Sequence, residues 1–319
     1  MARIGLVLGG GGITGASFQI GTLMALELAC DWEAEEADVI VGTSGGAYVA
    51  ALVRAGRLEL DSLVRTHEDP SSVADRIRSH IFHADPRLEV GRWLREGLLP
   101  GLRRPGLSLL MGSPARFGSS GLVRWVQEQV GEHAHAWPAA PTVVTAYDLA
   151  ARCRVAFGTV AAPEVSLADA VAASSAIPLV FHPHTIDGVS YVDGGVTSGT
   201  HLDLVLGSDS PLDLIIVIAP MAAERSRRGA WPHERLLDRV GRRSLSEEIE
   251  LVASRWPDTD VLVLQPNPAV LAVMRPNPMS ATAAVPTFVE TMRAMKEELA
   301  RPEIWEVLER HLVSTPARR

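Results

Sequence analysis

The chain has 319 residues, 47% of them hydrophobic and 21% charged, and a formal net charge of −8 at pH 7. This composition is typical of a globular protein with enough apolar side chains for a sizeable core. The negative charge, without a basic tail or stripe, gives no electrostatic basis for binding nucleic acid. Only two cysteines are present, Cys30 and Cys153, so neither a disulfide framework nor a cysteine-based zinc site is expected.

The N-terminus lacks the features of a secretory signal. MAR is followed by a six-residue apolar strand pattern, which is too short for a signal core and has no small-residue cleavage site after it. We expect no apolar run to reach the roughly 18–20 residues of a membrane-spanning helix. The sequence therefore predicts a cytoplasmic protein.

Short apolar runs alternate with helical patterns along the chain. The predicted strands are residues 4–9, 38–43, 142–149, 154–160, 213–220 and 260–266. The predicted helices are residues 15–30, 45–55, 119–131, 166–175, 234–255 and 286–300. Most strands are apolar on both faces, which is typical of a central sheet covered on both sides. Together these patterns predict an α/β layered fold.

The interval 56–141 contains no convincing strand and consists of helical patterns broken by Gly and Pro. We expect it to be a mainly helical cap inserted into a single domain, 1–319, in which residues 221–319 form a C-terminal helical and strand extension. Within the cap, residues 97–112 carry two leucine clusters. They either form a lid that contacts lipid or, as we favour, pack on the cap helices.

A glycine-rich loop, GGGGITG at residues 9–15, joins the first strand to the first helix. It fits G-x-G-x-x-G, which in a dinucleotide-binding fold needs an acidic residue at the end of the second strand. Asp38 stands at the start of that strand, and its end is GTSGG at residues 42–46. A nucleotide is therefore not expected, and the remaining hypothesis is that the loop binds the negative charge on a reacting carbonyl oxygen.

GTSGG fits the G-x-S-x-G pattern of a nucleophilic serine on a sharp strand-to-helix turn, with Gly42 and Gly46 around Ser44. Sequential strands usually lie close together. The serine hydroxyl and the amides of the glycine loop should then meet at one edge of the sheet, as acyl transfer requires.

The general base is less clear from the residues alone. None of the five histidines downstream of residue 180 lies in a recognisable catalytic setting: His182, His184, His201, His233 and His311. His182 and His184 fall in an HPH loop and are more easily explained as structural, whereas His201 is the hardest to dismiss. Asp193, followed by Gly194 and Gly195, closes the strand-like run SYVD, and in isolation this is an ordinary turn.

Taken together, GGGxxG, GTSGG and ASSAIP…YVDGG, in this order, resemble the patatin-like phospholipase family over about residues 3–220. The resemblance implies a three-layer α/β/α fold with a mostly parallel sheet and a catalytic dyad in which Ser44 is the nucleophile and Asp193 its base. It also implies an oxyanion hole from the amides of Gly10, Gly11 and Gly12, with Gly15 allowing close packing of the helix. No metal or other cofactor is implied. The substrates would be lipid acyl esters. The net negative charge and the lack of an obvious amphipathic anchor predict at most transient membrane contact.

One position departs from the family pattern. Thr14 stands where the family usually carries Arg or Lys, which puts the rate and any preference for anionic substrates in doubt. Two alternatives use the same site: an acyltransferase with the same acyl-enzyme, and a catalytically silent module that binds lipid.

Overall fold

The computed structural model describes residues 2–59, 68–85, 90–94, 115–225, 229–230 and 232–313. Within these residues eight strands form one sheet in the order β5-β6-β3-β2-β1-β7-β8, with β4 paired to β3. The strands are β1 (Ile4–Leu8), β2 (Val39–Thr43), β3 (Thr142–Asp148), β4 (Cys153–Phe157), β5 (His184–Ile186), β6 (Val189–Asp193), β7 (Leu214–Ile218) and β8 (Asp260–Leu264). The five strands from β3 to β8 along the sheet are parallel, while β4, β5 and β6 pair antiparallel.

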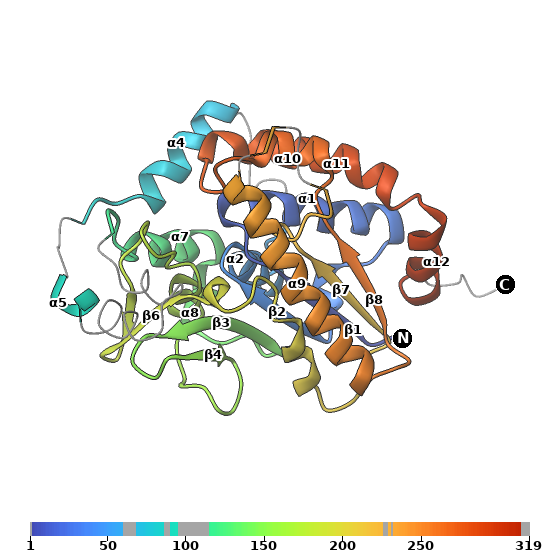
Figure 1. Ribbon diagram of the computed structural model, residues 1–319, viewed down its shortest axis with the longest axis horizontal. Coiled ribbons are helices and arrows are strands. Elements are labelled where there is room, and N and C mark those ends of the chain that lie inside the picture. The colour runs from blue at the N-terminus through green and yellow to red at the C-terminus, as the bar shows by residue number, and fades with distance from the viewer. Residues whose placement is uncertain are drawn as a thin grey trace.

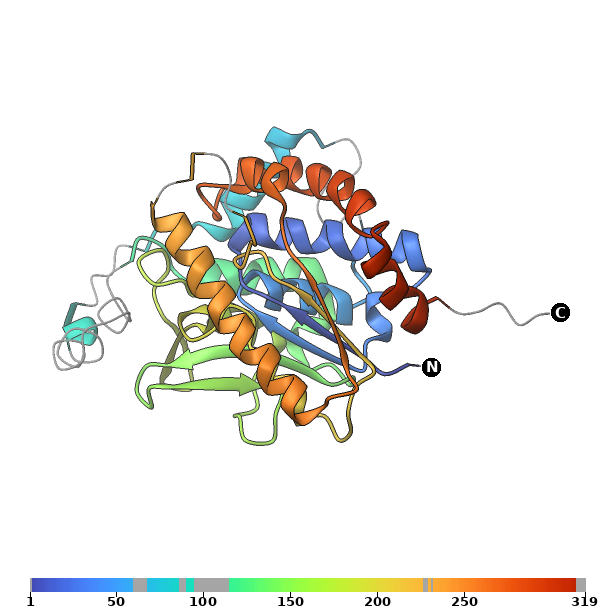
Figure 2. The same cartoon turned by 45° about the vertical axis from the view of Figure 1, so that its right-hand side comes forward.

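Helices cover both faces of the sheet. They are α1 (Gly12–Cys30), α2 (Gly45–Arg54), α4 (Pro70–Ile81), α5 (Val90–Trp93), α7 (Ser120–Val130), α8 (Leu167–Ser174), α9 (Pro232–Arg255), α10 (Pro268–Met274), α11 (Ala284–Glu298) and α12 (Pro302–His311). The long helix α9 crosses one face, and α1, α2 and α11 lie on the other (Figures 1 and 2).

The alternation of side chains along β1 explains the three layers. Leu6 and Leu8 belong to the core shared with α1 and α2, whereas Val7 belongs to a second core that includes Leu245 and Val252 of α9. Successive strand residues point to opposite faces, and both faces of β1 are fully buried. The predicted α/β fold with a mostly parallel, doubly covered sheet is confirmed.

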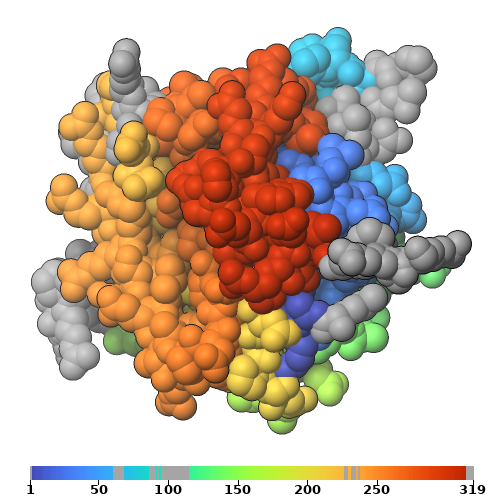
Figure 3. All heavy atoms as spheres, turned by 90° about the vertical axis from the view of Figure 1, so that its right-hand side faces the viewer, coloured from blue at the N-terminus to red at the C-terminus, as the bar shows by residue number. Residues whose placement is uncertain are grey.

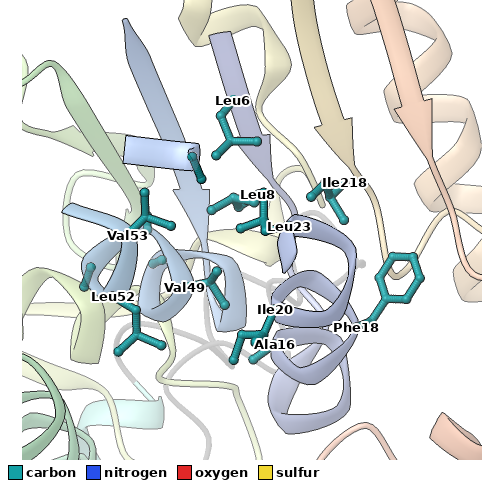
Figure 4. Packing of buried hydrophobic residues seen from close by; sticks show 14 of the residues in the cluster. Leu6, Leu8, Ala16, Phe18, Ile20, Leu23, Val49, Leu52, Val53 and Ile218 are labelled. Carbon is teal, nitrogen blue, oxygen red and sulfur yellow. The ribbon is translucent and has the colours of Figure 1, made fainter. Parts of the chain in front are cut away.

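Helix α1 is the one described helix whose length and composition would allow it to cross a membrane, contrary to the expectation from the sequence. However, 78% of its apolar window is buried inside the fold. Figure 4 shows Ala16 and Ile20 on the side of α1 towards α2, and Phe18 pointing away from them. This burial on several sides is that of a core helix.

All six predicted strands and all six predicted helices are present, and β6 contains the strand-like run SYVD, while β5, α10 and α12 fall outside the predicted ranges. The described residues of the interval 56–141 contain α4, α5 and α7 and no strand of the sheet. The leucine clusters at 97–112 lie outside the described residues. At the other end of the chain, α12 contacts β8 and lies beside the C-terminal part of α1 (Figure 3).

Candidate active site

Ser44 occupies a sharp turn between β2 and α2. Its φ of 54° is positive, which is uncommon for any residue other than glycine and is strained. The turn is held by a hydrogen bond from the Ser44 N–H to Ser174 Oγ at 2.8 Å. It also requires glycine at positions 42 and 46. A Cβ on Gly46 would lie 2.0 Å from the Leu8 carbonyl oxygen, and one on Gly42 would lie 2.7 Å from the next helical turn. The pattern G-x-S-x-G is thus a packing requirement.

Asp193 is the last residue of β6, and β3 lies between β6 and β2, the strand that leads to Ser44. Asp193 pairs with Ala146 in the antiparallel ladder, and its backbone N–H donates to the Ala176 carbonyl at 3.1 Å. The Ser44 hydroxyl donates a hydrogen bond directly to the Asp193 carboxylate. The Gly195 N–H donates to the same carboxylate at 2.7 Å. The two residues singled out from the sequence, 149 positions apart, therefore meet without an intervening imidazole.

Burial sets the basicity of this carboxylate. Asp193 is 5% exposed, and desolvation raises its pKa from 3.8 to about 6, while the hydrogen bonds from Ser44 and Gly195 act in the opposite direction. Desolvation outweighs the hydrogen bonds because the charged form loses its hydration. The result is a carboxylate that is ionised at neutral pH and is a stronger base than one in water.

The glycine loop lies against the other side of Ser44. A Cβ on Gly10 would be 3.6 Å from the Ser44 Cβ, and one on Gly45 would be 2.5 Å from the Gly12 carbonyl oxygen. The Gly10 N–H donates to the Gly199 carbonyl at 2.7 Å, so the oxyanion role predicted for the Gly10 amide does not fit this structure. The N–H groups of Gly11 and Gly12 have no acceptor in the described part of the chain.

Gly12 also needs to be a glycine. Its φ is +60°, and a Cβ would lie 2.7 Å from Met279 Sδ and 2.9 Å from the Pro278 carbonyl oxygen. Gly15 packs in the same way against the end of β7, where a Cβ would be 3.3 Å from Pro220. The first turn of α1 therefore lies closer to the segment at Pro278 and to Pro220 than side chains at Gly12 and Gly15 would permit.

Thr14, the residue that departs from the family pattern, is fully buried. Its N–H donates to the Pro278 carbonyl at 3.0 Å, and its hydroxyl lies 3.3 Å from the Met274 carbonyl and 3.4 Å from that of Pro278. Thr14 thereby anchors the segment that follows α10 onto the glycine loop. Met279 of this segment lines the pocket at Ser44. No local pattern in the sequence indicates this long-range contact.

An apolar pocket opens at Ser44 between α1, α2, α4 and α7. Its apolar walls come from all four helices and from the segment that precedes β5: Ala16, Ile20, Tyr48, Ile77, Trp125 and Phe181. Tyr48 and Trp125 are in ring contact, with centroids 6.2 Å apart. The pocket reaches from Gly12 to Ile20, eight residues along α1, which is about 12 Å at 1.5 Å per residue.

His201, His184 and His311 take no direct part in this constellation, and the side chain of His233 lies outside the described part of the chain. His201 is buried behind it, where Nδ1 lies 3.2 Å from Thr43 Oγ1 and Nε2 lies 3.0 Å from Thr197 Oγ1. Burial lowers its pKa to about 3, so the ring is neutral and joins the strand end before Ser44 to the loop after Asp193. His311 pairs with Asp260 at the far end of β8. His184, expected in a loop, begins β5.

A family model described as patatin-like phospholipase matches residues 6–206. This range covers more than half of the chain, and the chain belongs to the patatin-like phospholipase family. The resemblance stated from the sequence is thereby confirmed at the level of the family. No curated protein matches the sequence.

Three solved structures are similar to this chain at low identity. VipD from Legionella pneumophila is 14% identical, with a TM-score of 0.39 over 93% of this chain and 67% of that one. Human GIVD cytosolic phospholipase A2, solved with methyl gamma-linolenyl fluorophosphonate, is 13% identical, with a TM-score of 0.42 over 98% of this chain and 59% of that one. The type III effector ExoU is 17% identical, with a TM-score of 0.29 over 99% and 71%.

Proposed function

We propose that the protein is a serine hydrolase of lipid acyl esters, of the phospholipase A, lysophospholipase or esterase type, with Ser44 as nucleophile and Asp193 as base. The observation that carries the proposal is the hydrogen bond from the Ser44 hydroxyl to the buried carboxylate of Asp193. The backbone of Ser44 is strained, and Ser44 lines an apolar pocket. Membership of the patatin-like phospholipase family supports the lipid substrate class.

In the first half of the reaction, Ser44 Oγ attacks the ester carbonyl and its proton passes to Asp193. The oxyanion that forms accepts hydrogen bonds from the N–H groups of Gly11 and Gly12. One such donor typically lowers the barrier by about 3–4 kcal/mol. The leaving alcohol takes the proton from Asp193, and the acyl group stays on Ser44 as an ester.

In the second half, water attacks the acyl-enzyme. Asp193 accepts the proton of that water, and Ser44 Oγ recovers a proton as the carboxylic acid leaves. A single carboxylate can serve both halves because its pKa of about 6 lies near the working pH, where proton transfer in both directions is efficient. His201 supports the geometry as a neutral side chain.

The apolar pocket would hold the acyl chain. Ile20, Trp125 and the other apolar side chains bury methylene groups, each worth about 0.8 kcal/mol on removal from water. The ester carbonyl would then lie at Ser44, with Met279 on one side of the entrance. The pocket supplies affinity for the chain, and the head group would remain towards its mouth.

Hydrolysis of p-nitrophenyl esters over a series of chain lengths tests the proposal. We expect the wild type to turn over the esters, and Ser44→Ala and Asp193→Asn to lose at least about a thousandfold in kcat/KM. Asp187→Asn is the matched control, because Asp187 is exposed in the turn of the hairpin that carries Asp193, and it should retain full activity. Full activity of folded Ser44→Ala would overturn the assignment.

Adding alcohol acceptors to the same assay separates hydrolysis from acyl transfer. If the acyl group appears on the acceptor rather than in free acid, the protein is an acyltransferase that uses the same acyl-enzyme. A folded wild type that binds lipid but turns over no ester would instead be a silent binding module.

A further inference from the structure

A second set of nucleophile, base and acid lies away from Ser44. Ser119 immediately precedes α7, His184 begins β5, and Asp169 lies in the first turn of α8. Ser119 Oγ is 2.9 Å from His184 Nδ1, and His184 Nε2 is 3.0 Å from Asp169 Oδ1. Among the residues that the structure describes, none lines both the cavity at Ser119 and the apolar pocket at Ser44.

The hydrogen bonds assign a role to each group. The hydrogen bond from His184 is the main cause that lowers the pKa of the Asp169 carboxyl, so Asp169 is ionised and accepts from Nε2–H. The other ring nitrogen, Nδ1, is then an acceptor, and the Ser119 hydroxyl donates to it. Ser166 Oγ donates to the second oxygen of Asp169 at 2.6 Å and holds the carboxylate in place. The order serine, imidazole, carboxylate is that of a catalytic triad, with the two ring nitrogens exchanged relative to the Ser-His-Asp template.

Helix capping does not account for the position of the Ser119 hydroxyl. A serine before a helix usually accepts a hydrogen bond from an N–H of the first turn, but Ser119 makes no side-chain cap. The next N–H, of Ser120, has no acceptor in the described part of the chain. In nucleophile turns, the N–H after the serine is an oxyanion donor, and the positive end of α7 favours negative charge at this place.

Most residues that line the cavity around Ser119 are polar, unlike those of the pocket at Ser44. Ser119 is partly exposed, and the cavity is also lined by Ser120, Arg124 and His182. His182 is held away from Ser119, with Nε2 3.3 Å from the Asp85 carbonyl. A small activated ester or phosphonyl group can reach Ser119 Oγ here, whereas nothing in this lining would hold a long acyl chain.

We propose that Ser119 is a second reactive serine, activated by His184 and Asp169, which accepts acyl or phosphonyl groups from small activated reagents. With an ester, Ser119 Oγ bonds to the carbonyl carbon and its proton passes to His184 Nδ1. The ester C–O bond then breaks, the alcohol leaves with that proton, and water later releases the acid. With a fluorophosphonate, the O–P bond forms, the P–F bond breaks and fluoride leaves with the proton.

Labelling of the full chain carrying Ser44→Ala tests this proposal independently of the function of Ser44. The protein is incubated with a small alkyl fluorophosphonate, and the adduct is located by intact mass and peptide mapping. We expect one adduct, on Ser119, and none in the double variant with Ser119→Ala. Ser254→Ala is the matched control, because it removes an exposed serine hydroxyl on α9 that lines neither cavity, and it should leave labelling unchanged.

The role of His184 is tested in the same background. A positioned general base contributes about 10²–10⁴-fold, so His184→Gln and, as a second variant at the far end of the relay, Asp169→Asn should each slow labelling of Ser119 by at least about tenfold while thermal unfolding shows a folded chain. The proposal is overturned if Ser119 acquires no adduct, or if it is labelled equally fast in folded His184→Gln and Asp169→Asn. Failure of Ser44 to react in the wild type would contradict the proposed function alone.

Discussion

The raised pKa of Asp193 predicts how stability depends on pH. The folded chain holds this proton up to about pH 6, whereas an unperturbed carboxyl loses it near 3.8. Between these values the folded state binds more protons than the unfolded state, so the free energy of unfolding falls as the pH rises through this range and the contribution is constant above it. At 1.36 kcal/mol for each pKa unit, the ionised carboxylate costs about 3 kcal/mol of stability.

Asp193→Asn removes this cost while keeping the shape of the side chain and an oxygen for the Gly195 N–H. At about pH 4.5 the wild type already bears about 1 kcal/mol of this cost. Between about pH 4.5 and about pH 8, the free energy of unfolding of the variant should therefore rise by about 2 kcal/mol relative to that of the wild type. Urea denaturation at the two pH values measures this difference, with Asp187→Asn as the control that shows none. A difference between Asp193→Asn and the wild type that is independent of pH would refute the argument from burial.

Four further predictions follow from the site. The kcat/KM of the wild type should rise about tenfold for each pH unit below about pH 6 and level off above it, because Asp193 must be ionised; a flat profile across pH 6 contradicts its role as base. Gly46→Ala should destabilise the chain by about 3 kcal/mol or more in urea, because its Cβ meets a backbone carbonyl, whereas Gly207→Ala, with open space at its Cβ, should be nearly neutral. Thr14→Val should cost about 1 kcal/mol of stability. It should also lower kcat, because the segment that carries Met279 would be less firmly held. Unchanged stability would show that the hydroxyl contacts contribute nothing. Trp125→Leu should shift the ester preference towards longer chains, and an unchanged profile of kcat/KM against chain length would place the acyl chain elsewhere.

The strands and the turn at Ser44 could be predicted because their signals are local or have fixed spacing. Apolar runs such as LIIVI in β7 can only be buried on both faces, and their alternation with helical patterns limits the fold to a few layer arrangements. The turn at Ser44 carries its own explanation in Gly42 and Gly46. For Asp193, spacing alone gave an ordinary turn, and only the resemblance to the family gave the pairing with Ser44.

The remaining features depend on contacts between distant segments, which no local pattern encodes. The Gly10 amide was predicted to face the oxyanion, but the loop at Gly199 accepts its hydrogen bond. Thr14 stands in place of the Arg or Lys usual in the family, and its hydroxyl binds backbone carbonyls that lie 260 and 264 residues further on. The sequence predicts a loop at His184 because the three residues of β5 are too few to show the alternation of a strand.

The most direct test of the central claim is the site and rate of covalent capture in the wild-type chain. A fluorophosphonate with a long alkyl chain should label Ser44 rapidly, as located by peptide mapping, and Asp193→Asn should slow that labelling at least a hundredfold without unfolding the protein. Asp187→Asn should label at the wild-type rate. If the wild type acquires no adduct on Ser44, or if Asp193→Asn reacts as fast as the wild type, the Ser44–Asp193 dyad is not the catalytic centre of this protein.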